Sequence, residues 1–422
     1  MRLMKVAVMG GLLCGGMGVY ADENVGLKEL EGRVTALSQE VAKLKQGSAP
    51  AEKEDSTKGG ISFGGYGELV YHDVAARTDA GEPSGEKNTL DLLRFVLNVG
   101  YRFSEKFVLN SEIEVEHANQ EKRGEVAVEM ATLDYLWAAP LNVRAGLLLV
   151  PMGLINESHE PPVFHGVNRP DVEQKIIPTT WRENGVGIFG QAGSFSYRTY
   201  VVNGFQAVND YAITGTSGSV DGFSAADGVK EGSAEGSAAF AENLAWVGRA
   251  DYSGIPGLLV GGSLYTGDAG QGAVVAGEKL KARTTLWETH GDYQWQGLEL
   301  RGLYSRVYVG DVGLINQAQG YTGNESVGER MWGGYGQVAY NVLGHSAGGL
   351  YLAPFYRYER YNTQAKVPDG YSSDPANDRT EMVYGITFKP IPTVVLKGDF
   401  QNNTNRAGSG VDQWNLGVGY MF

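Results

Sequence analysis

Residues of types that bind metals or catalyse hydrolysis lie together in the segment 151–183. Ser158, His159 and Glu160 are consecutive, and two prolines separate them from His165. A zinc hydrolase motif places two histidines on one face of a helix, and prolines inside the segment prevent such a helix. A Ser-His-acid triad assembles in space and cannot be inferred from adjacency in sequence. We therefore predict no enzyme, no metal site and no cofactor, and we expect these side chains to be hydrogen-bonded or solvated.

Carboxylates at alternate positions carry a second kind of chemistry. Glu112, Glu114 and Glu116 alternate with Ile113 and Val115, which is the period of a β-strand with one polar and one apolar face. On the lipid face of a membrane barrel a charge at mid-depth costs roughly 2–4 kcal/mol, so these carboxylates must face water. The same alternation predicts a set of pore-lining residues: Arg94, Arg102, Glu112, Glu114, Glu116, Arg144, Arg249, Glu288, His290, Asp292, Arg301 and Arg357.

Alternating segments of this kind recur along the chain from residue 61 onward. Short connections alternate with long ones, as in outer-membrane barrels with short periplasmic turns and long extracellular loops. About sixteen strands leave a lumen too wide for side chains to fill. We predict an all-β antiparallel transmembrane barrel over 61–422, with strands near 61–73, 88–103, 106–118, 126–138, 141–150, 184–191, 195–203, 243–252, 258–266, 283–295, 298–308, 331–341, 349–360, 380–389, 393–401 and 412–422.

The final segment shows the alternation most clearly. Trp414, Tyr420 and Phe422 share one face with aliphatic residues between them, so aromatic rings would lie at both membrane interfaces. An edge strand of a soluble sandwich has the same period, but a sandwich has no reason to sort its connections by length. We expect these three aromatic residues to act in assembly, where the barrel-assembly machinery reads the end of the chain.

The start of the chain and its overall charge indicate an exported protein. Residues 1–21 combine a basic start, an apolar stretch and a small-residue cleavage site, which predicts a signal peptide. Cys14, the single cysteine, falls inside that segment, so disulfide chemistry is excluded after cleavage. The formal charge of −14 argues against a nucleic-acid partner, which requires a basic face.

Residues 22–47 are predicted to form a periplasmic helix. Apolar residues recur every seven positions in two interleaved series, the pattern of a coiled-coil seam: Leu27, Val34 and Val41, then Leu30, Leu37 and Leu44. Under three heptads make only a marginal helix in isolation, so a lone helix against the barrel or lipid remains an alternative. β-Branched residues in the first series favour two strands rather than three. Residues 48–60 read as a polar linker.

The connection 151–183 differs in composition from the connection 204–242, which is rich in Gly, Ser and Ala and which we expect to be filler, that is, a spacer without packed side chains. It has apolar anchors, prolines and many charges, which suit a loop of fixed shape. We predict that it folds inward and narrows the pore; packing over the mouth or against a neighbouring subunit is the alternative. Its candidate constriction residues are Glu157, His159, Glu160, His165, Arg169, Asp171, Glu173, Lys175 and Arg182.

Three motifs carry a resemblance to a known family. F-G-G-Y-G-E-L at 63–69, E-I-E-V-E-H at 112–117, and P-M-G-L-I-N-E followed by I-I-P-T-T-W between 151 and 181 resemble bacterial porins of the phosphate-selective O and P group. The resemblance covers most of 61–422. It implies sixteen strands, a homotrimer, an inward third extracellular loop and phosphate selection through basic residues.

The charges of the predicted inner wall lead to a different selectivity. By strand parity, nine basic and twelve acidic residues point into the barrel. Rings of acidic side chains favour cations, but their charge is screened within about 8–10 Å at physiological salt. We therefore predict passive diffusion of small hydrophilic solutes or ions with weak cation preference. A phosphate- or anion-selective porin is one alternative, and a structural envelope tether or sheath is another. The expected partners are outer-membrane lipid and lipopolysaccharide, two further copies of the chain, and small solutes.

Overall fold

A computed structural model of the chain describes residues 59–118, 124–344 and 349–422. The predicted signal peptide 1–21, the predicted helix 22–47 and most of the linker 48–60 lie outside the described residues. Among those described, no helix has both the length and the apolar character needed to cross a membrane.

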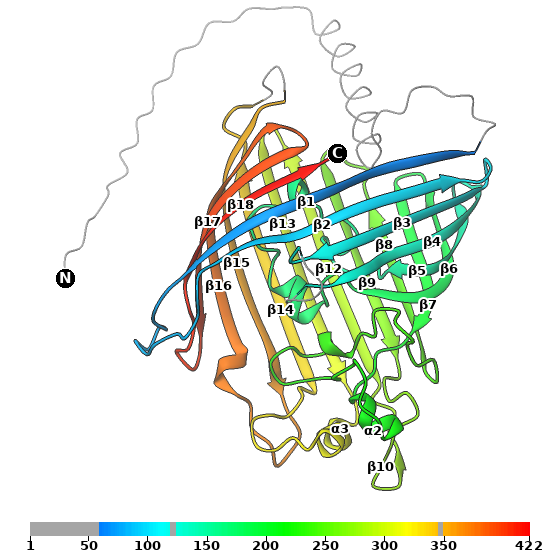
Figure 1. Ribbon diagram of the computed structural model, residues 1–422, viewed down its shortest axis with the longest axis vertical. Coiled ribbons are helices and arrows are strands. Elements are labelled where there is room, and N and C mark those ends of the chain that lie inside the picture. Colours follow the sequence, from blue (N-terminus) through cyan, green and yellow to red (C-terminus); the bar gives the residue numbers. More distant parts are fainter. Residues whose placement is uncertain (1–58, 119–123, 345–348) are drawn as a thin grey trace, which may run out of the picture. The chain divides into compact units, whose positions relative to one another are not determined.

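Sixteen antiparallel strands close into one barrel, with β1 paired to the last strand, β18. Figure 1 shows the blue first strand lying beside the red last strand. Their register runs from Tyr66 opposite Met421 to Val74 opposite Gln413. The strands are β1 Gly60–Val74, β2 Thr89–Arg102, β3 Phe107–Glu116, β4 Val126–Ala138, β5 Leu141–Leu149, β6 Arg182–Ala192, β7 Phe195–Asn203, β8 Leu244–Tyr252, β9 Leu258–Gly267, β12 Thr284–Trp295, β13 Leu298–Val309, β14 Arg330–Tyr340, β15 Tyr351–Lys366, β16 Asp378–Ile391, β17 Val394–Asn405 and β18 Gln413–Met421.

The predicted fold class is confirmed, and most predicted boundaries agree with the observed ones. The clearest departure is β15, which continues to Lys366 rather than ending at residue 360. Its pairing with β14 passes a register shift near Arg330 and resumes with Arg330 opposite Lys366. The two strands therefore extend together beyond the predicted end.

The two faces of β18 follow the predicted alternation. Trp414, Leu416 and Val418 are 61%, 60% and 40% exposed, whereas Asn415 between them is 1% exposed. Phe422 closes the seam, because its backbone N–H donates to the Gly65 carbonyl at 2.9 Å. Polar residues thus face the barrel interior and apolar residues face outward.

One irregularity changes the alternation within β4. The register of β3 against β4 shifts between Glu112, which lies opposite Met130, and Ile113, which lies opposite Val128. Glu129 falls in the shift with no partner of its own, as the extra residue of a β-bulge does. Both Glu129 and Asp134 are consequently buried, although one is odd-numbered and the other even-numbered.

The long connections carry the remaining elements. Figure 1 shows α2, α3 and β10 at the end of the barrel opposite the one where the strand pair β1 and β18 finishes at the C-terminus. Their bounds, with those of the smaller elements, are η1 Pro161–Val163, η2 Val172–Ile176, α2 Asp210–Thr214, η3 Lys230–Gly232, β10 Val274–Val275, β11 Glu278–Lys279, α3 Val312–Gln319 and η4 Pro375–Asn377.

The connection between β7 and β8 is not filler. Phe205 and Phe223 are fully buried there, and Phe205 stacks on Trp181 with ring centroids 4.6 Å apart. These residues belong to one apolar cluster that also includes Tyr265 of β9 and Val312 of α3. The β7–β8 connection therefore has a low fraction of apolar residues, but a few of them are buried and pack the long connections against one another.

Candidate functional site: the barrel interior and the β5–β6 connection

The connection between β5 and β6, residues 150–181, is packed through apolar anchors. Met152, Ile176 and Trp181 are almost completely buried and join the same apolar cluster as Leu303 of β13 and Tyr335 of β14. Burial of this kind favours one fixed conformation over a mobile loop.

Glu173 fastens the two halves of this connection. Its Oε2 accepts hydrogen bonds from the backbone N–H groups of Leu154 at 2.7 Å and Ile155 at 2.8 Å, and its Oε1 accepts one from the Tyr335 hydroxyl at 2.6 Å. Burial raises the pKa of Glu173, and the three donors partly offset that rise. Gly153 fits here because its φ is +74° and a Cβ would lie 2.3 Å from the carboxylate.

A second anchor joins the connection to β15, β16 and β17. His165 has a Thr387 hydroxyl 2.9 Å from Nδ1 and a Glu299 carboxylate oxygen 3.1 Å from Nε2, and the Val167 N–H donates to Asp399 at 2.6 Å. Burial lowers the pKa of His165, while Glu299 acts in the opposite direction. The His165 carbonyl also accepts a hydrogen bond from Arg357 at 3.2 Å.

Glycines in β18 permit this close approach. A Cβ at Gly417 would lie 3.3 Å from Val167, and a Cβ at Gly419 would lie 2.3 Å from the Cβ of Pro161. The second distance is far below a normal contact. The small residues of the last strand are therefore matched to the connection that lies against them.

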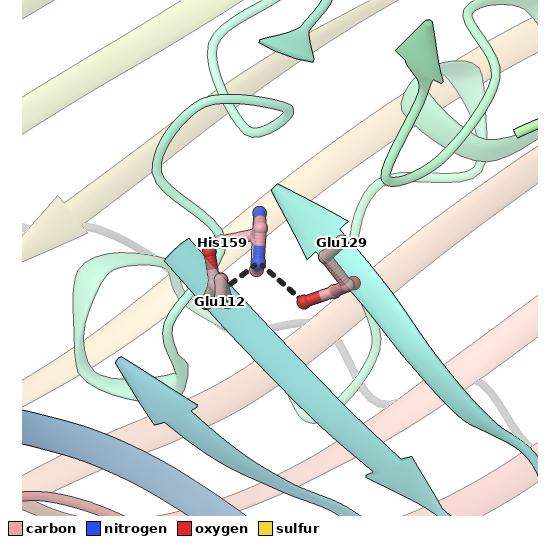
Figure 2. Close-up of side chains that lie close together, drawn as sticks. All are labelled: Glu112, Glu129 and His159. Atoms are coloured by element: carbon pink, nitrogen blue, oxygen red, sulfur yellow. Dashed lines mark ion pairs between the residues drawn. The ribbon is translucent and has the colours of Figure 1, made fainter. Parts of the chain in front are cut away.

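His159 meets carboxylates from two other strands, as Figure 2 shows. Its Nε2 lies 3.8 Å from Glu112 of β3 and 3.6 Å from Glu129 of β4, and its Nδ1 lies 3.0 Å from the Asn156 carbonyl oxygen. Burial lowers the pKa of His159, but the two carboxylates more than reverse this, so that the pKa is well above the ordinary value. Glu160 is not part of this group.

Sequence reasoning missed Glu129. Counted back from Asp134, position 129 has the parity of the outward face. The bulge beside Glu112 reverses that parity. The only local signal was that Glu129 would otherwise place a carboxylate among outward-facing apolar residues, which is costly on a lipid face.

The remaining predicted loop residues other than Glu160 also have partners. Glu157 pairs with Arg198 at 3.1 Å, and Asp171 accepts a hydrogen bond from the Tyr361 hydroxyl at 2.5 Å. Two ion pairs, Lys175–Asp227 at 2.5 Å and Arg182–Glu235, join the segment between β5 and β6 to the segment between β7 and β8. Within the β5–β6 connection, Arg169 donates to the hydroxyls of Thr179 and Thr180 at 2.6 and 2.7 Å.

The Lys175–Asp227 contact also shifts the pKa of Asp227. Burial raises the pKa of Asp227, but the hydrogen bond and the positive charge of Lys175 exceed this effect, so the net pKa is lowered. The charged form of Asp227 is therefore favoured near neutral pH.

The predicted inward arginines are paired with carboxylates. The pairs with their N···O distances are Arg94–Glu68 at 2.6 Å, Arg144–Asp134 at 2.8 Å, Arg249–Asp251 at 2.9 Å, Arg301–Asp292 at 2.7 Å and Arg357–Glu359 at 2.5 Å. His290 lies between Asp251 and Glu288, 2.9 Å from each. Arg102, by contrast, is exposed at the end of β2 and donates to the Glu105 carbonyl at 3.4 Å.

No family model matches the chain. An Aquifex aeolicus (strain VF5) protein described as uncharacterized is 36% identical over 399 residues, which cover 92% of this chain and 86% of that protein. The fold resembles the outer membrane channel DcaP of Acinetobacter baumannii, with a TM-score of 0.54, 11% identity, and coverage of 89% of this chain and 100% of that one.

Two further solved structures have the same architecture. The loop L8 deletion mutant of OmpT, an outer membrane protein of Vibrio cholerae, gives a TM-score of 0.53 at 12% identity, with 87% of this chain and 100% of that chain covered. The anion-selective porin from Comamonas acidovorans gives 0.50 at 14% identity, with 86% and 100% covered. At these identities the likeness establishes a porin-type barrel fold.

Proposed function

We propose that this chain, which belongs to the same family as the Aquifex aeolicus protein, is an outer-membrane porin that forms a water-filled channel for small hydrophilic solutes or ions. The observation that carries the proposal is the division of polar and apolar side chains between the two barrel faces. Trp414, Leu416 and Val418 are exposed on one face of β18, whereas Glu112 and Glu114 are buried on one face of β3. Such a division suits a barrel between lipid outside and water inside.

We place the constriction at the β5–β6 connection. Its contacts reach strands on both sides of the seam, because the His159 carbonyl accepts from Arg94 of β2 at 3.3 Å and the Val172 N–H donates to Glu359 of β15 at 3.1 Å. A segment held by strands from two parts of the barrel wall is well placed to cross the lumen. The predicted loop residues would then form the narrowest section.

The water path would run beside the part of the wall that the connection leaves accessible. The side chains of Arg144, Arg198 and Arg301 are 23%, 31% and 19% exposed, whereas that of Arg357 is fully buried. Each exposed arginine has a carboxylate partner. Solutes would therefore meet alternating charges of both signs along this path.

This arrangement favours weak cation preference or near-neutral selectivity. Nine basic and twelve acidic residues face inward by parity, and Glu129 is a further buried carboxylate. Phosphate selection needs cationic groups free to bind the anion, and the arginines just described are already paired. The anion-selective Comamonas porin shares the fold of this chain and supplies no argument on selectivity.

The predicted features of assembly and location remain part of the same proposal. They comprise export by residues 1–21, a periplasmic helix at 22–47, a homotrimer, insertion by the barrel-assembly machinery, and contact with outer-membrane lipid and lipopolysaccharide. A closed barrel with an exposed apolar face supports the membrane location among these features, because such a face requires a lipid environment.

Conductance in a planar lipid bilayer tests the function. The folded protein is expected to give discrete current steps, and a salt gradient is expected to give a reversal potential near zero or weakly cation-selective. Phosphate should block chloride current only slightly. The absence of current steps from folded protein would favour a tether or sheath, and strong anion selectivity with tight phosphate block would overturn the charge argument.

A further inference from the structure

We propose that His159, Glu112 and Glu129 bind one divalent transition-metal cation, of which Zn²⁺ is the test case. The three residues come from the β5–β6 connection, β3 and β4. Among the described residues they form a group whose ligand atoms all lie within 4.8 Å of one another. Figure 2 shows the imidazole and the two carboxylates pointing toward one point. This site is separate from the proposed channel function and does not depend on it.

The orientation of His159 suits a metal ligand. Its Nδ1 lies 3.0 Å from the Asn156 carbonyl oxygen, and a carbonyl only accepts, so Nδ1 carries the proton that it donates. A cation that displaces the Nε2 proton to solvent would then meet the Nε2 lone pair on the side of the ring that faces the two carboxylates. Metal-bound histidines are oriented in this way by a backbone carbonyl or a carboxylate.

Two other buried histidines make the contrast clear. His290 has one carboxylate at each ring nitrogen, 2.9 Å away in both cases. His165 has Thr387 at one nitrogen and Glu299 at the other. Both nitrogens of these rings are engaged at hydrogen-bond distance, on opposite sides of the ring. The Nε2 of His159 has no hydrogen-bond partner among the described residues.

The distances fit a shared ion better than a direct hydrogen bond. Nε2 is 3.6 Å from Glu129 and 3.8 Å from Glu112, beyond the usual limit of about 3.2 Å. Two ligands each about 2.1 Å from one zinc ion at the tetrahedral angle lie about 3.4 Å apart. A shift of a few tenths of an ångström would therefore bring Nε2 to this spacing from each carboxylate, and a water molecule would supply a fourth ligand.

Glu129 lacks a positive group at close range. It is 0% exposed, and neither of its carboxylate oxygens accepts a hydrogen bond of ordinary length from a described residue. Glu114 is buried on the same face of β3 as Glu112, and Arg94 of β2 is already paired with Glu68 at 2.6 Å. The imidazole of His159 faces Glu129 at 3.6 Å without a hydrogen bond. A buried charge needs closer compensation than this, and a cation bound in place of the His159 Nε2 proton would supply it.

The β-bulge is a separate indication that Glu129 has a functional role inside the barrel. Regular pairing would direct Glu129 to the outer face, and the register shift beside Glu112 brings it inside. Bulges commonly redirect a side chain beside a functional site. Here the redirected side chain completes a group that already contains a carboxylate and an imidazole.

The donor set selects the class of cation. One imidazole nitrogen with carboxylate oxygens suits Zn²⁺ and neighbouring transition metals, whereas Ca²⁺ and Mg²⁺ prefer oxygen ligands alone. The spacing of His159, Glu160 and His165 along the sequence is unsuitable for a metal site. The partners proposed here come from distant strands. A bound ion would join the β5–β6 connection to β3 and β4.

The test uses the full chain, folded in detergent without a histidine tag, stripped with chelator and checked by heat-modifiable migration. Isothermal titration with Zn²⁺ should show one high-affinity ion per chain, with little response to Mg²⁺. Co²⁺ should give the visible absorption bands of a low-symmetry site. Glu129→Gln, which keeps the shape of the side chain, and His159→Gln should each weaken Zn²⁺ binding at least tenfold.

His290→Gln is the matched control, because it alters a buried histidine that also lies between two carboxylates, and Zn²⁺ affinity should not change. The proposal is overturned if the folded wild-type chain binds no Zn²⁺, or if binding survives Glu129→Gln undiminished. If one of the two variants fails to fold, the other decides whether the bound ion occupies this site. The titration does not involve conduction, so its outcome leaves the porin proposal to be judged separately.

Discussion

Replacing Glu173 with alanine should release the β5–β6 connection from the barrel wall. The carboxylate accepts hydrogen bonds from Leu154, Ile155 and Tyr335, and it is 3% exposed. The substitution leaves three buried donors without an acceptor. Each such donor costs about 1–3 kcal/mol, so the connection loses at least about 3 kcal/mol of its attachment.

That loss has a measurable size. A change of about 1.4 kcal/mol is a factor of ten in an equilibrium constant. A loss of about 3 kcal/mol therefore shifts the ratio of attached to released connection by roughly a hundredfold. If the attached connection narrows the pore, the released state should show larger current steps and greater open-channel noise.

Single-channel recording in a planar bilayer measures both quantities on folded protein selected by heat-modifiable migration. Val163→Ala is the control within the same connection, since Val163 is 40% exposed and its truncation removes no buried partner. Glu173→Ala channels whose step size and noise equal those of wild type would refute the role given to this carboxylate.

Three further outcomes are expected. Gly419→Ala should raise current noise, because its Cβ would lie 2.3 Å from Pro161 and overpacking costs about 1–3 kcal/mol. Gly336→Ala, whose Cβ would meet no atom within 4 Å, should behave as wild type. Equal noise in the two variants would contradict the expected clash at Gly419. Burial raises the pKa of Glu173, so the contribution of its titration to attachment is complete below the pKa of the unfolded chain and is lost as the pH rises through the folded-state pKa. Glu173→Gln should remove this part of the pH dependence of the current noise. An unchanged pH profile in the variant would count against this role of Glu173. Deleting Phe422, which pairs with Gly65 across the seam, should reduce the heat-modifiable folded fraction without blocking export, and a normal folded yield would argue against a role in closure.

The barrel could be predicted from sequence because its signal is local. Along β18 each residue reports its own face, as Trp414 and Asn415 show with exposures of 61% and 1%, and turns end each segment. The strand count, order and antiparallel pairing follow from that repetition. The extension of β15 to Lys366 could not be predicted, since it depends on pairing with β14 at Arg330.

The interior contacts were beyond local reasoning. The approach of His159 to Glu112 and Glu129 depends on how the β5–β6 connection lies against two distant strands. Glu129 has the parity of the outward face, and the single bulge that reverses this parity cannot be read from the sequence. The buried anchors Phe205 and Phe223 were concealed by the polar and glycine-rich residues around them.

The most direct test of the central claim compares the single-channel conductance of the wild-type chain with that of a variant lacking residues 158–175. Both proteins are folded in detergent, matched by heat-modifiable migration and recorded in the same bilayer. A porin narrowed by the β5–β6 connection predicts clear steps in wild type and larger steps in the deletion, because the narrowest section dominates the resistance of a pore. Steps of equal or smaller size in the deletion, or no steps from folded wild type, would contradict it.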